Sequence, residues 1–324
     1  MNDQQLDDLV RGSVPLESLE ARERARLRLR AAIAREDVAA MRRRRRVVGL
    51  IAAAVLAMVG ILVLQVVLPP GSGGPRLSAA EEIRKLGRVS ADQEPLTPGP
   101  DGYIYSHYLE QRQQSYGGER NQYIFDVRAD VESWLGNDRS GGRDTTIEQV
   151  GFVSPLDREN WVKAGSPPPP AVGPTEPERY GPGELAVFAV DQLPTDPVAL
   201  RNAIEKGDVI GTAPGDVNLL KTIGTLLSQE NLSPELRQAL FEVAATIPSV
   251  TVQYDVKDYV GRSSVVVTAT DESGDSKLFF DQSSAQLLGT SVDYPAADGR
   301  PAFTEWRAYL DSGIVSQIGD RPAP

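Results

Sequence analysis

The residues that carry most enzyme chemistry are scarce in this chain of 324 residues. It contains one histidine, His107, and no cysteine. The lack of cysteine excludes a thiol nucleophile, a disulfide and a thiolate zinc site. His107 stands between Ser106 and Tyr108, so a Ser-His-Asp triad is one hypothesis, but no nucleophile-elbow motif accompanies it. We therefore expect no enzymatic activity and keep a hydrolase only as the third alternative.

Acidic side chains offer the next candidate site. Asp271, Glu272 and Asp275 crowd the segment "ATDESGDSK", and clustered oxygen ligands suit calcium. The segment lacks the alternate-residue ligands and the distal glutamate of an EF-hand loop, so a hairpin turn is the simpler interpretation. The segments "GPGELAV" and "GTAPGDV" lack the spacing of a phosphate-binding loop. We expect neither a metal nor a cofactor.

A run of apolar residues between 47 and 68 indicates where the chain resides. It holds 22 residues, with Gln65 as the only polar side chain. A helix of that length spans about 33 Å, enough for a hydrocarbon core of about 30 Å. Arg42–Arg46 precede the run, and basic residues beside a span tend to stay cytoplasmic. We predict a single-pass cell-membrane protein with a cytoplasmic N-terminus and an extracytoplasmic C-terminal domain.

Two questions about this run stay open from the sequence. The first is cleavage, because "RLSAAEE" offers a weak signal-peptide cleavage site. The apolar region of a signal peptide is usually about 7–15 residues, shorter than this run, which favours a permanent span. The second is dimerisation, because Gly49, Ala53 and Ala57 recur every four residues, as in small-residue helix contacts. Alanine is common in apolar helices, so the stripe alone decides nothing.

Charge divides the chain into compartments. Residues 1–46 hold 12 Lys plus Arg and 8 Asp plus Glu, whereas residues 69–324 hold 22 and 37. The acidic second part would repel nucleic acid, so we expect no nucleic-acid partner. We divide the chain into a cytoplasmic amphipathic segment (1–46), a transmembrane helix (47–68), a linker (69–78) and an extracytoplasmic domain (79–324).

The cytoplasmic segment contains one amphipathic pattern, residues 14–38. Ala25, Leu29, Ala32 and Ile33 fall at helical spacing, and arginine and glutamate occupy the other faces. One interpretation is a docking helix for a cytoplasmic regulator or for the inner leaflet. The other is a solvated helix next to the membrane that binds nothing. The sequence does not separate the two.

The extracytoplasmic domain reads as strands, then helices, then strands. Capping residues and apolar stripes predict helices that begin near Ser78, at Thr195 or Asp196, and near Ser233, and another helix within 214–230. The Pro-rich residues 165–183 predict an irregular loop. Alternation and turn signals predict strands within 103–112, 122–136, 145–153, 250–256, 263–270, 276–282, 285–294 and 303–322. This order predicts an α+β fold, an antiparallel sheet covered by helices on one face.

Four segments together resemble a known family: "LPTDPVALR", "LSPELRQALFEVAATIPSV", "VKDYVGRSSVVV" and "LFFDQSSAQLLG", in this order. They resemble an uncharacterised family of actinobacterial single-pass membrane proteins. Its members look like regulators paired with extracytoplasmic-function sigma factors, and their outer domains are similar to the unclosed half-barrel of lipoprotein carriers. Residues 1–46 lack the His-x3-Cys-x2-Cys pattern of zinc anti-sigma factors, which excludes that role.

The resemblance implies a concave apolar sheet face that holds a lipid or a partner's strand. The leading hypothesis is a non-enzymatic envelope sensor or regulator that binds a lipid or an envelope protein outside and signals through the span. The alternative is a membrane-tethered lipid or lipoprotein carrier. For each single candidate lining residue, a place in the core is the favoured alternative. The candidates are the aromatics Tyr103, Tyr105, Tyr123, Phe125, Phe279 and Phe280.

Overall fold

The computed structural model describes the chain from Ser78 onward. The cytoplasmic segment, the apolar run 47–68 and most of the linker lie outside the described residues, so the predictions made for them remain predictions. No helix in the described part is long and apolar enough to cross a bilayer. The described residues are 78–117, 122–185, 190–207, 214–297 and 300–323.

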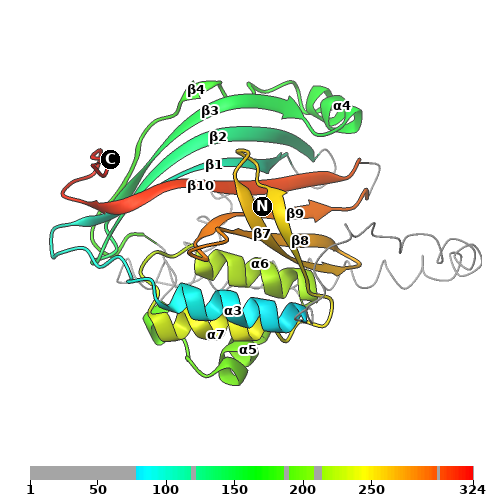
Figure 1. The fold of residues 1–324 in the computed structure, drawn as a ribbon. Helices are drawn as coiled ribbons and strands as arrows, with labels where there is room; N and C mark the ends of the chain where they lie inside the picture. The colour runs from blue at the N-terminus through cyan, green and yellow to red at the C-terminus, as the bar shows by residue number, and fades with distance from the viewer. Residues whose placement is uncertain (1–77, 118–121, 186–189, 208–213, 298–299, 324) are drawn as a thin grey trace, which may run out of the picture. The chain divides into compact units, whose positions relative to one another are not determined.

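A ten-stranded antiparallel sheet forms the frame of the domain, with the order β4-β3-β2-β1-β10-β9-β8-β7-β6 and β5 beside β3. The order has two ends, β4 and β6, so the described sheet is not closed. Figure 1 shows the sheet curving over a layer of helices. The strands are β1 (Tyr103–Tyr116), β2 (Tyr123–Gly136), β3 (Gly141–Phe152), β4 (Gly173–Pro174), β5 (Glu178–Tyr180), β6 (Thr251–Lys257), β7 (Ser263–Asp271), β8 (Gly274–Phe280), β9 (Leu287–Tyr294) and β10 (Phe303–Val315).

The pairing of β1 with β10 joins the first strands to the last ones. Its register sets Glu110 opposite Arg307, and it shifts between His107 and Tyr108, where β10 contributes one extra residue. Such a bulge bends a strand and increases its twist. The last strand of the chain, β10, thus lies in the middle of the sheet.

Five α-helices and one short 3₁₀ helix accompany the sheet in the described residues. The predicted caps are confirmed at three helix starts, because Ser78, Asp196 and Ser233 each accept a hydrogen bond from a backbone N–H of the first turn. Helices α3, α5 and α6 each contact α7. Helix α6 also packs on β7, β8 and β9. The helices are α3 (Ala79–Ala91), α4 (Pro155–Lys163), η1 (Val190–Gln192), α5 (Pro197–Lys206), α6 (Asp216–Leu227) and α7 (Pro234–Ala244).

The main core lies between these helices and one face of β7 and β8. Leu278 and Phe280 of β8 belong to it together with Ile223 and Leu240 of the helices, all almost fully buried. We call this helix-contacting side of the sheet the inner face. Because side chains alternate along a strand, the register assigns every other residue of the neighbouring strands to the same face. One such row runs Val267, Leu278, Thr290, Arg307, Glu110, Ala129 and Ile147.

The predicted α+β fold is confirmed as a large unclosed antiparallel sheet with helices on its inner face. Two local expectations need correction. The Pro-rich residues 165–183 are not wholly irregular, because β4 and β5 lie within them and pair with β3. Helix α4 was not expected, since "PLDRENWVK" has no apolar stripe; its start is fixed by the Ser154 cap and by Pro155 in the first turn.

Candidate ligand-binding cavity

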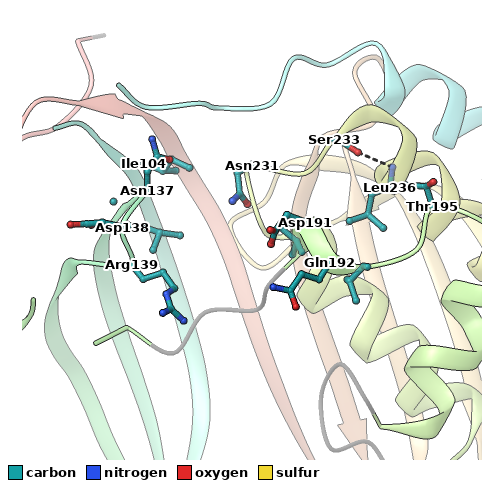
Figure 2. Close-up of a pocket in the computed structure, with 14 residues that line it drawn as sticks. Ile104, Asn137, Asp138, Arg139, Asp191, Gln192, Thr195, Asn231, Ser233 and Leu236 are labelled. Atoms are coloured by element: carbon teal, nitrogen blue, oxygen red, sulfur yellow. Dashed lines mark hydrogen bonds between the residues drawn. The ribbon is translucent and has the colours of Figure 1, made fainter. Parts of the chain in front are cut away.

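The largest described cavity opens at one end of the inner face and has a volume of about 700 Å³. We call it the entrance cavity. One wall comes from Ile104 of β1 and from the β2–β3 turn, and the other from residues 190–195 and the start of α7. Figure 2 shows these two walls facing each other, with Asn137 and Asp138 on one side and Asp191, Gln192 and Asn231 on the other. Its rim is therefore polar.

Local hydrogen bonds fix both walls of the entrance cavity. In the β2–β3 turn, Ser140 N donates to the Asp138 carboxylate at 2.9 Å, and Arg139 adopts a left-handed φ of 61°. The hydrogen bonds from Ser140, side chain first and backbone second, lower the pKa of Asp138. On the other wall, Leu236 N donates to the Ser233 hydroxyl at 3.2 Å and begins α7 (Figure 2). The two walls are thus set by a tight turn and a helix cap.

Two smaller cavities continue along the inner face. The middle cavity, about 200 Å³, shares the wall residues Ile104, Leu135 and Asn231 with the entrance cavity. The inner cavity, about 180 Å³, shares Arg307 and Tyr309 with the middle cavity. All three border β1, from Ile104 at the entrance cavity to Arg112 at the inner cavity. Between Ile104 and Arg112 that strand covers about 27 Å, at about 3.3 Å per residue.

Apolar clusters surround this row of cavities on the inner face. Tyr108, Ala129 and Val131 form one cluster with Tyr309 packed against it. Farther along the same strands a second cluster contains Tyr123, Phe125, Val127 and Ile147, against which Trp161 of α4 packs. The inner face of β1–β3 therefore combines apolar clusters with polar residues such as Ser106 and Ser133 and with a few charged side chains.

Three charged side chains, Glu110, Arg112 and Arg307, lie together where β1 pairs with β10, a place that we call the seam. Glu110 is only 7% exposed, and it accepts from Arg112 and from Arg307, each at 2.8 Å. The Arg307 guanidinium also lies 4.4 Å from the centre of the Tyr108 ring. Burial acts to lower the pKa of Arg307, but Tyr309, Tyr108 and Glu110 outweigh it and the net shift is upward. Arg307 is therefore a permanent cation.

A second acid, Glu230, borders the middle cavity from the loop between α6 and α7. Burial raises the pKa of this carboxyl, against smaller lowering effects of Ser312 and of Arg237. Arg237 is itself buried and donates to the carbonyl oxygens of Ser90 and Gln93, at 2.9 and 2.8 Å. The loop that carries Glu230 is thus tied to the end of α3.

The six aromatic residues singled out in the sequence are distributed over four clusters. Tyr103 and Tyr105 pack on the outer face with Trp134 and Val315. Tyr123 and Phe125 lie together on the inner face. Phe279 lies on the outer face with Val266, whereas Phe280 enters the main core and packs on Phe241. None of the six lines the entrance, middle or inner cavity. Ligand contact by any of them stays a prediction.

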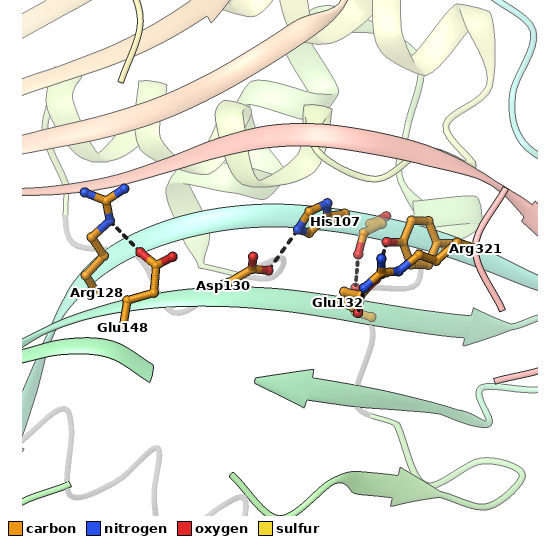
Figure 3. A network of polar contacts seen from close by, with 9 residues as sticks. His107, Arg128, Asp130, Glu132, Glu148 and Arg321 are labelled. Carbon is orange, nitrogen blue, oxygen red and sulfur yellow. Dashed lines mark hydrogen bonds and ion pairs between the residues drawn. The ribbon is translucent and has the colours of Figure 1, made fainter. Parts of the chain in front are cut away.

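The histidine lies on the outer face, within a polar network shown in Figure 3. His107 Nε2 is 2.8 Å from a carboxylate oxygen of Asp130. Farther along the same face, Glu132 accepts from Tyr105 and from Arg321. The two serines adjacent in sequence to His107 and Glu132, Ser106 and Ser133, point to the inner face because side chains alternate. The described residues therefore do not bring a serine to His107.

The acidic segment near residue 271 is used to build a turn. The Asp271 carboxylate accepts from Ser273 N at 2.7 Å and from Val217 N at 3.1 Å, which ties the β7–β8 turn to the start of α6. Within the part of the chain that the structure describes, no three His, Asp or Glu side chains converge as metal ligands do.

The sequence reasoning missed the charged residues of the cavities, above all Glu110, Arg143 and Arg307. The sequence did contain a signal for Glu110. Glu110 has the same parity along its strand as Ile104 and Tyr108, so alternation places a charge on the same face as these two residues. A charge at an inward position requires a partner. The identity of that partner depends on the β1–β10 pairing, which no local pattern encodes.

No family model and no curated protein matches the sequence. Among solved structures, a Vibrio parahaemolyticus domain assigned to an outer membrane lipoprotein-sorting protein is 10% identical, covers 75% of this chain and 95% of its own, and gives a TM-score of 0.18. A DUF1329 family protein from Desulfovibrio piger is 9% identical, covers 73% of this chain and 93% of its own, and also gives 0.18. Both likenesses are distant. The resemblance to the actinobacterial family stays a prediction.

Proposed function

We propose that this domain is a non-enzymatic binding module for an amphipathic ligand, a lipid or a lipid-modified peptide. In this proposal the apolar run 47–68 tethers the module to the membrane on the extracytoplasmic side, and the module acts as a carrier. The observation that supports the proposal is the row of three cavities along the inner face of an unclosed sheet.

The dimensions and the chemistry of the row fit such a ligand. Small-molecule sites usually enclose about 300–1,000 Å³, and the entrance cavity has about 700 Å³. One leaflet of a bilayer contributes roughly 15 Å of hydrocarbon, half of the core thickness. The row of about 27 Å along β1 is therefore longer than a single lipid chain. The walls combine apolar side chains, such as Ile104 and Leu135, with polar and charged ones, which suits a molecule with an apolar and a polar part.

A carrier needs fewer elements than a sensor, and for that reason we favour it. A ligand site and a tether are sufficient for a carrier. A sensor requires, in addition, two conformations that the ligand distinguishes and that reach residues 1–46. The cavities supply the site, and the sensor hypothesis is retained as the competing outcome of a separate test.

Photo-crosslinking in membranes tests the binding proposal. The full chain is incorporated into vesicles that contain a phospholipid with a diazirine in its acyl chain, and the labelled peptides are identified by mass spectrometry. We expect label on peptides of β1 and β2 that border the cavities. Label confined to the apolar run 47–68 would contradict the proposal.

A pair of matched variants locates the label. Ser106→Trp places an indole in the middle cavity, because Ser106 lines it. It should reduce labelling of β1 and β2 severalfold. Thr146→Trp is the control, since Thr146 is exposed and, by its pairing with Asp130, lies on the outer face. Equal labelling in the two variants would show that the lipid binds elsewhere.

A further inference from the structure

Arg143 is a cation without a partner at the wall of the middle cavity. It lies on β3, opposite Ser133 of β2, and both side chains line that cavity. Among the described residues its guanidinium makes no hydrogen bond and no ion pair, although most other arginines of the sheet are paired. A guanidinium presents donors in a planar fork that matches a carboxylate or a phosphate. Arg143 is an exposed residue, so its guanidinium is solvated and available to an anion that enters the middle cavity.

Arg307 supplies a second, partly used cation to the same cavity. One of its terminal nitrogens donates to Glu110, but its Nε atom is buried without a partner. Glu110 is shared with Arg112, so the three side chains together keep one positive charge. About two fifths of the Arg307 side chain remains accessible, 39%. Because this arginine lines two cavities, its accessible surface faces their interior.

Tyr108 adds a hydroxyl group to the lining of the same cavity, and Arg307 lies over its ring. The hydroxyl makes no hydrogen bond in the described part of the chain, and the residue lines the middle cavity. Burial raises the pKa of Tyr108, while the charges of Arg307 and then Arg143 oppose that rise. Both guanidinium groups are thus close enough to the phenol to act on it. The phenol remains protonated at neutral pH and has one hydrogen bond to donate.

Three acids lie near the cavity cations: Glu110, Glu230 and Glu178. Glu178 of β5 lies opposite Arg143 in the register, but among the described residues the two side chains form no ion pair. Glu110 is already neutralised by two arginines, and Glu230 is balanced by the buried Arg237 and has a raised pKa because of burial. The surrounding domain is strongly acidic, with 37 Asp plus Glu and 22 Lys plus Arg in residues 69–324. An anion that the rest of the domain repels is therefore attracted at this one place.

We infer that the middle cavity binds the oxyanion headgroup, a phosphate or a carboxylate, of an amphipathic ligand through Arg143, Arg307 and the Tyr108 hydroxyl. The inference rests on the proposed function and specifies the ligand's polar end. The apolar end would lie against Ile104 and Leu135, which line both the middle and the entrance cavity.

Two probes with one photoreactive alkyl chain and different heads test the inference. One carries a phosphate and the other an uncharged glycerol, and each is added to vesicles of neutral lipid that contain the full chain. A charge-assisted, bidentate contact predicts about tenfold more cavity labelling by the phosphate probe. Arg143→Gln should reduce that ratio to nearly one without reducing labelling by the glycerol probe. Arg158→Gln removes the same charge from an exposed site on α4 and should change neither.

The outcomes separate the two proposals. Cavity labelling that is equal for both heads, in the wild type and in Arg143→Gln, would overturn the headgroup site and leave the binding function standing. The absence of cavity labelling by either probe would overturn the binding function itself. Complete displacement of the phosphate probe by millimolar inorganic phosphate would show a site for free phosphate, and this too would overturn the headgroup inference. Tyr108→Phe should lower the ratio severalfold with the fold intact.

Discussion

At the scale of single residues, Glu110 is the side chain on which the seam of the sheet depends. It is buried between two arginines, and removing one partner of a buried pair leaves an uncompensated charge. We predict that Glu110→Met lowers the free energy of unfolding by about 3 kcal/mol, the low end of the range because Arg307 is partly accessible. The double variant Glu110→Met/Arg307→Met should recover most of that loss.

Denaturant unfolding of the full chain, followed by tryptophan fluorescence, measures these differences. The matched control is the exposed pair of Arg201 and Glu205 on α5, which has the same 2.8 Å separation. There Glu205→Met should cost less than about 1 kcal/mol. Equal losses at the two pairs would mean that the seam pair is not buried in the folded protein.

A second prediction for a single residue concerns Asp281 and the dependence of the domain's stability on pH. Its carboxylate accepts from the Ser283 hydroxyl and from Ser284 N, in that order of effect, which lowers its pKa from 3.8 to about 2. A lowered pKa in the folded state means that the unfolded state binds more protons between these values. The stabilisation is therefore complete above pH about 4 and is lost as the pH falls towards about 2.

Asp281→Ala should accordingly destabilise the domain at neutral pH and approach the wild type at the acidic end of that window. The measurement is the denaturation midpoint of both proteins across the window. Asp101→Ala, at an exposed carboxylate without a described hydrogen bond, is the control. A difference between Asp281→Ala and the wild type that does not depend on pH would contradict the assignment.

Single residues also show which parts of the candidate site could be predicted from the sequence and which could not. Phe279 and Phe280 are adjacent, so alternation alone places them on opposite faces of β8 and excludes a shared site. Tyr103 and Tyr105 have the opposite parity to Tyr108, and the structure accordingly places them on the outer face. The cavity cations were harder to find, because an arginine in an alternating strand is ordinarily a solvated residue.

At the scale of elements, the sequence predicted the helix starts, because they depend on residues that are close together in the chain. The caps Ser78, Asp196 and Ser233 began helices as expected, because a side-chain acceptor satisfies a free N–H wherever the chain folds. Short strands of two or three residues, such as β4 and β5, carry no periodic signal and form only because β3 is present beside them. The pairing of β1 with β10 likewise cannot be predicted from a local pattern, because it joins residues almost 200 positions apart in the sequence.

The contact between α3 and α7 supplies the element-scale prediction. Gly87 lies so close to α7 that an added Cβ would be 2.7 Å from the Cβ of Phe241. Alanine improves helix propensity by about 1 kcal/mol, but overpacking a core costs about 1–3 kcal/mol. We expect Gly87→Ala to lower the free energy of unfolding by about 1 kcal/mol, measured by denaturant unfolding. Gly99→Ala, with no atom within 4 Å of its added Cβ, should stay close to neutral.

At the scale of the whole molecule, the question is whether the ligand cavity communicates with residues 1–46. A ligand shifts an equilibrium only by its difference in affinity for two states. In a carrier, loading the cavity leaves the N-terminal segment unaffected. In a sensor, loading changes what that segment exposes. The many arginines of residues 1–46 make this difference measurable, because each is a site for trypsin.

We predict the carrier outcome. Inverted vesicles that contain the full chain and expose the predicted cytoplasmic segment are treated briefly with trypsin, with and without the photo-crosslinked lipid. The rate of cleavage within residues 1–46 should be the same in both samples, and a chain that lacks residues 1–40 should label its cavity as well as the wild type. A several-fold change in cleavage on loading, lost in Ser106→Trp and kept in Thr146→Trp, would instead show a signal that leaves the middle cavity and reaches the cytoplasmic segment. Such a result would make the protein a sensor, with the same ligand site as its input.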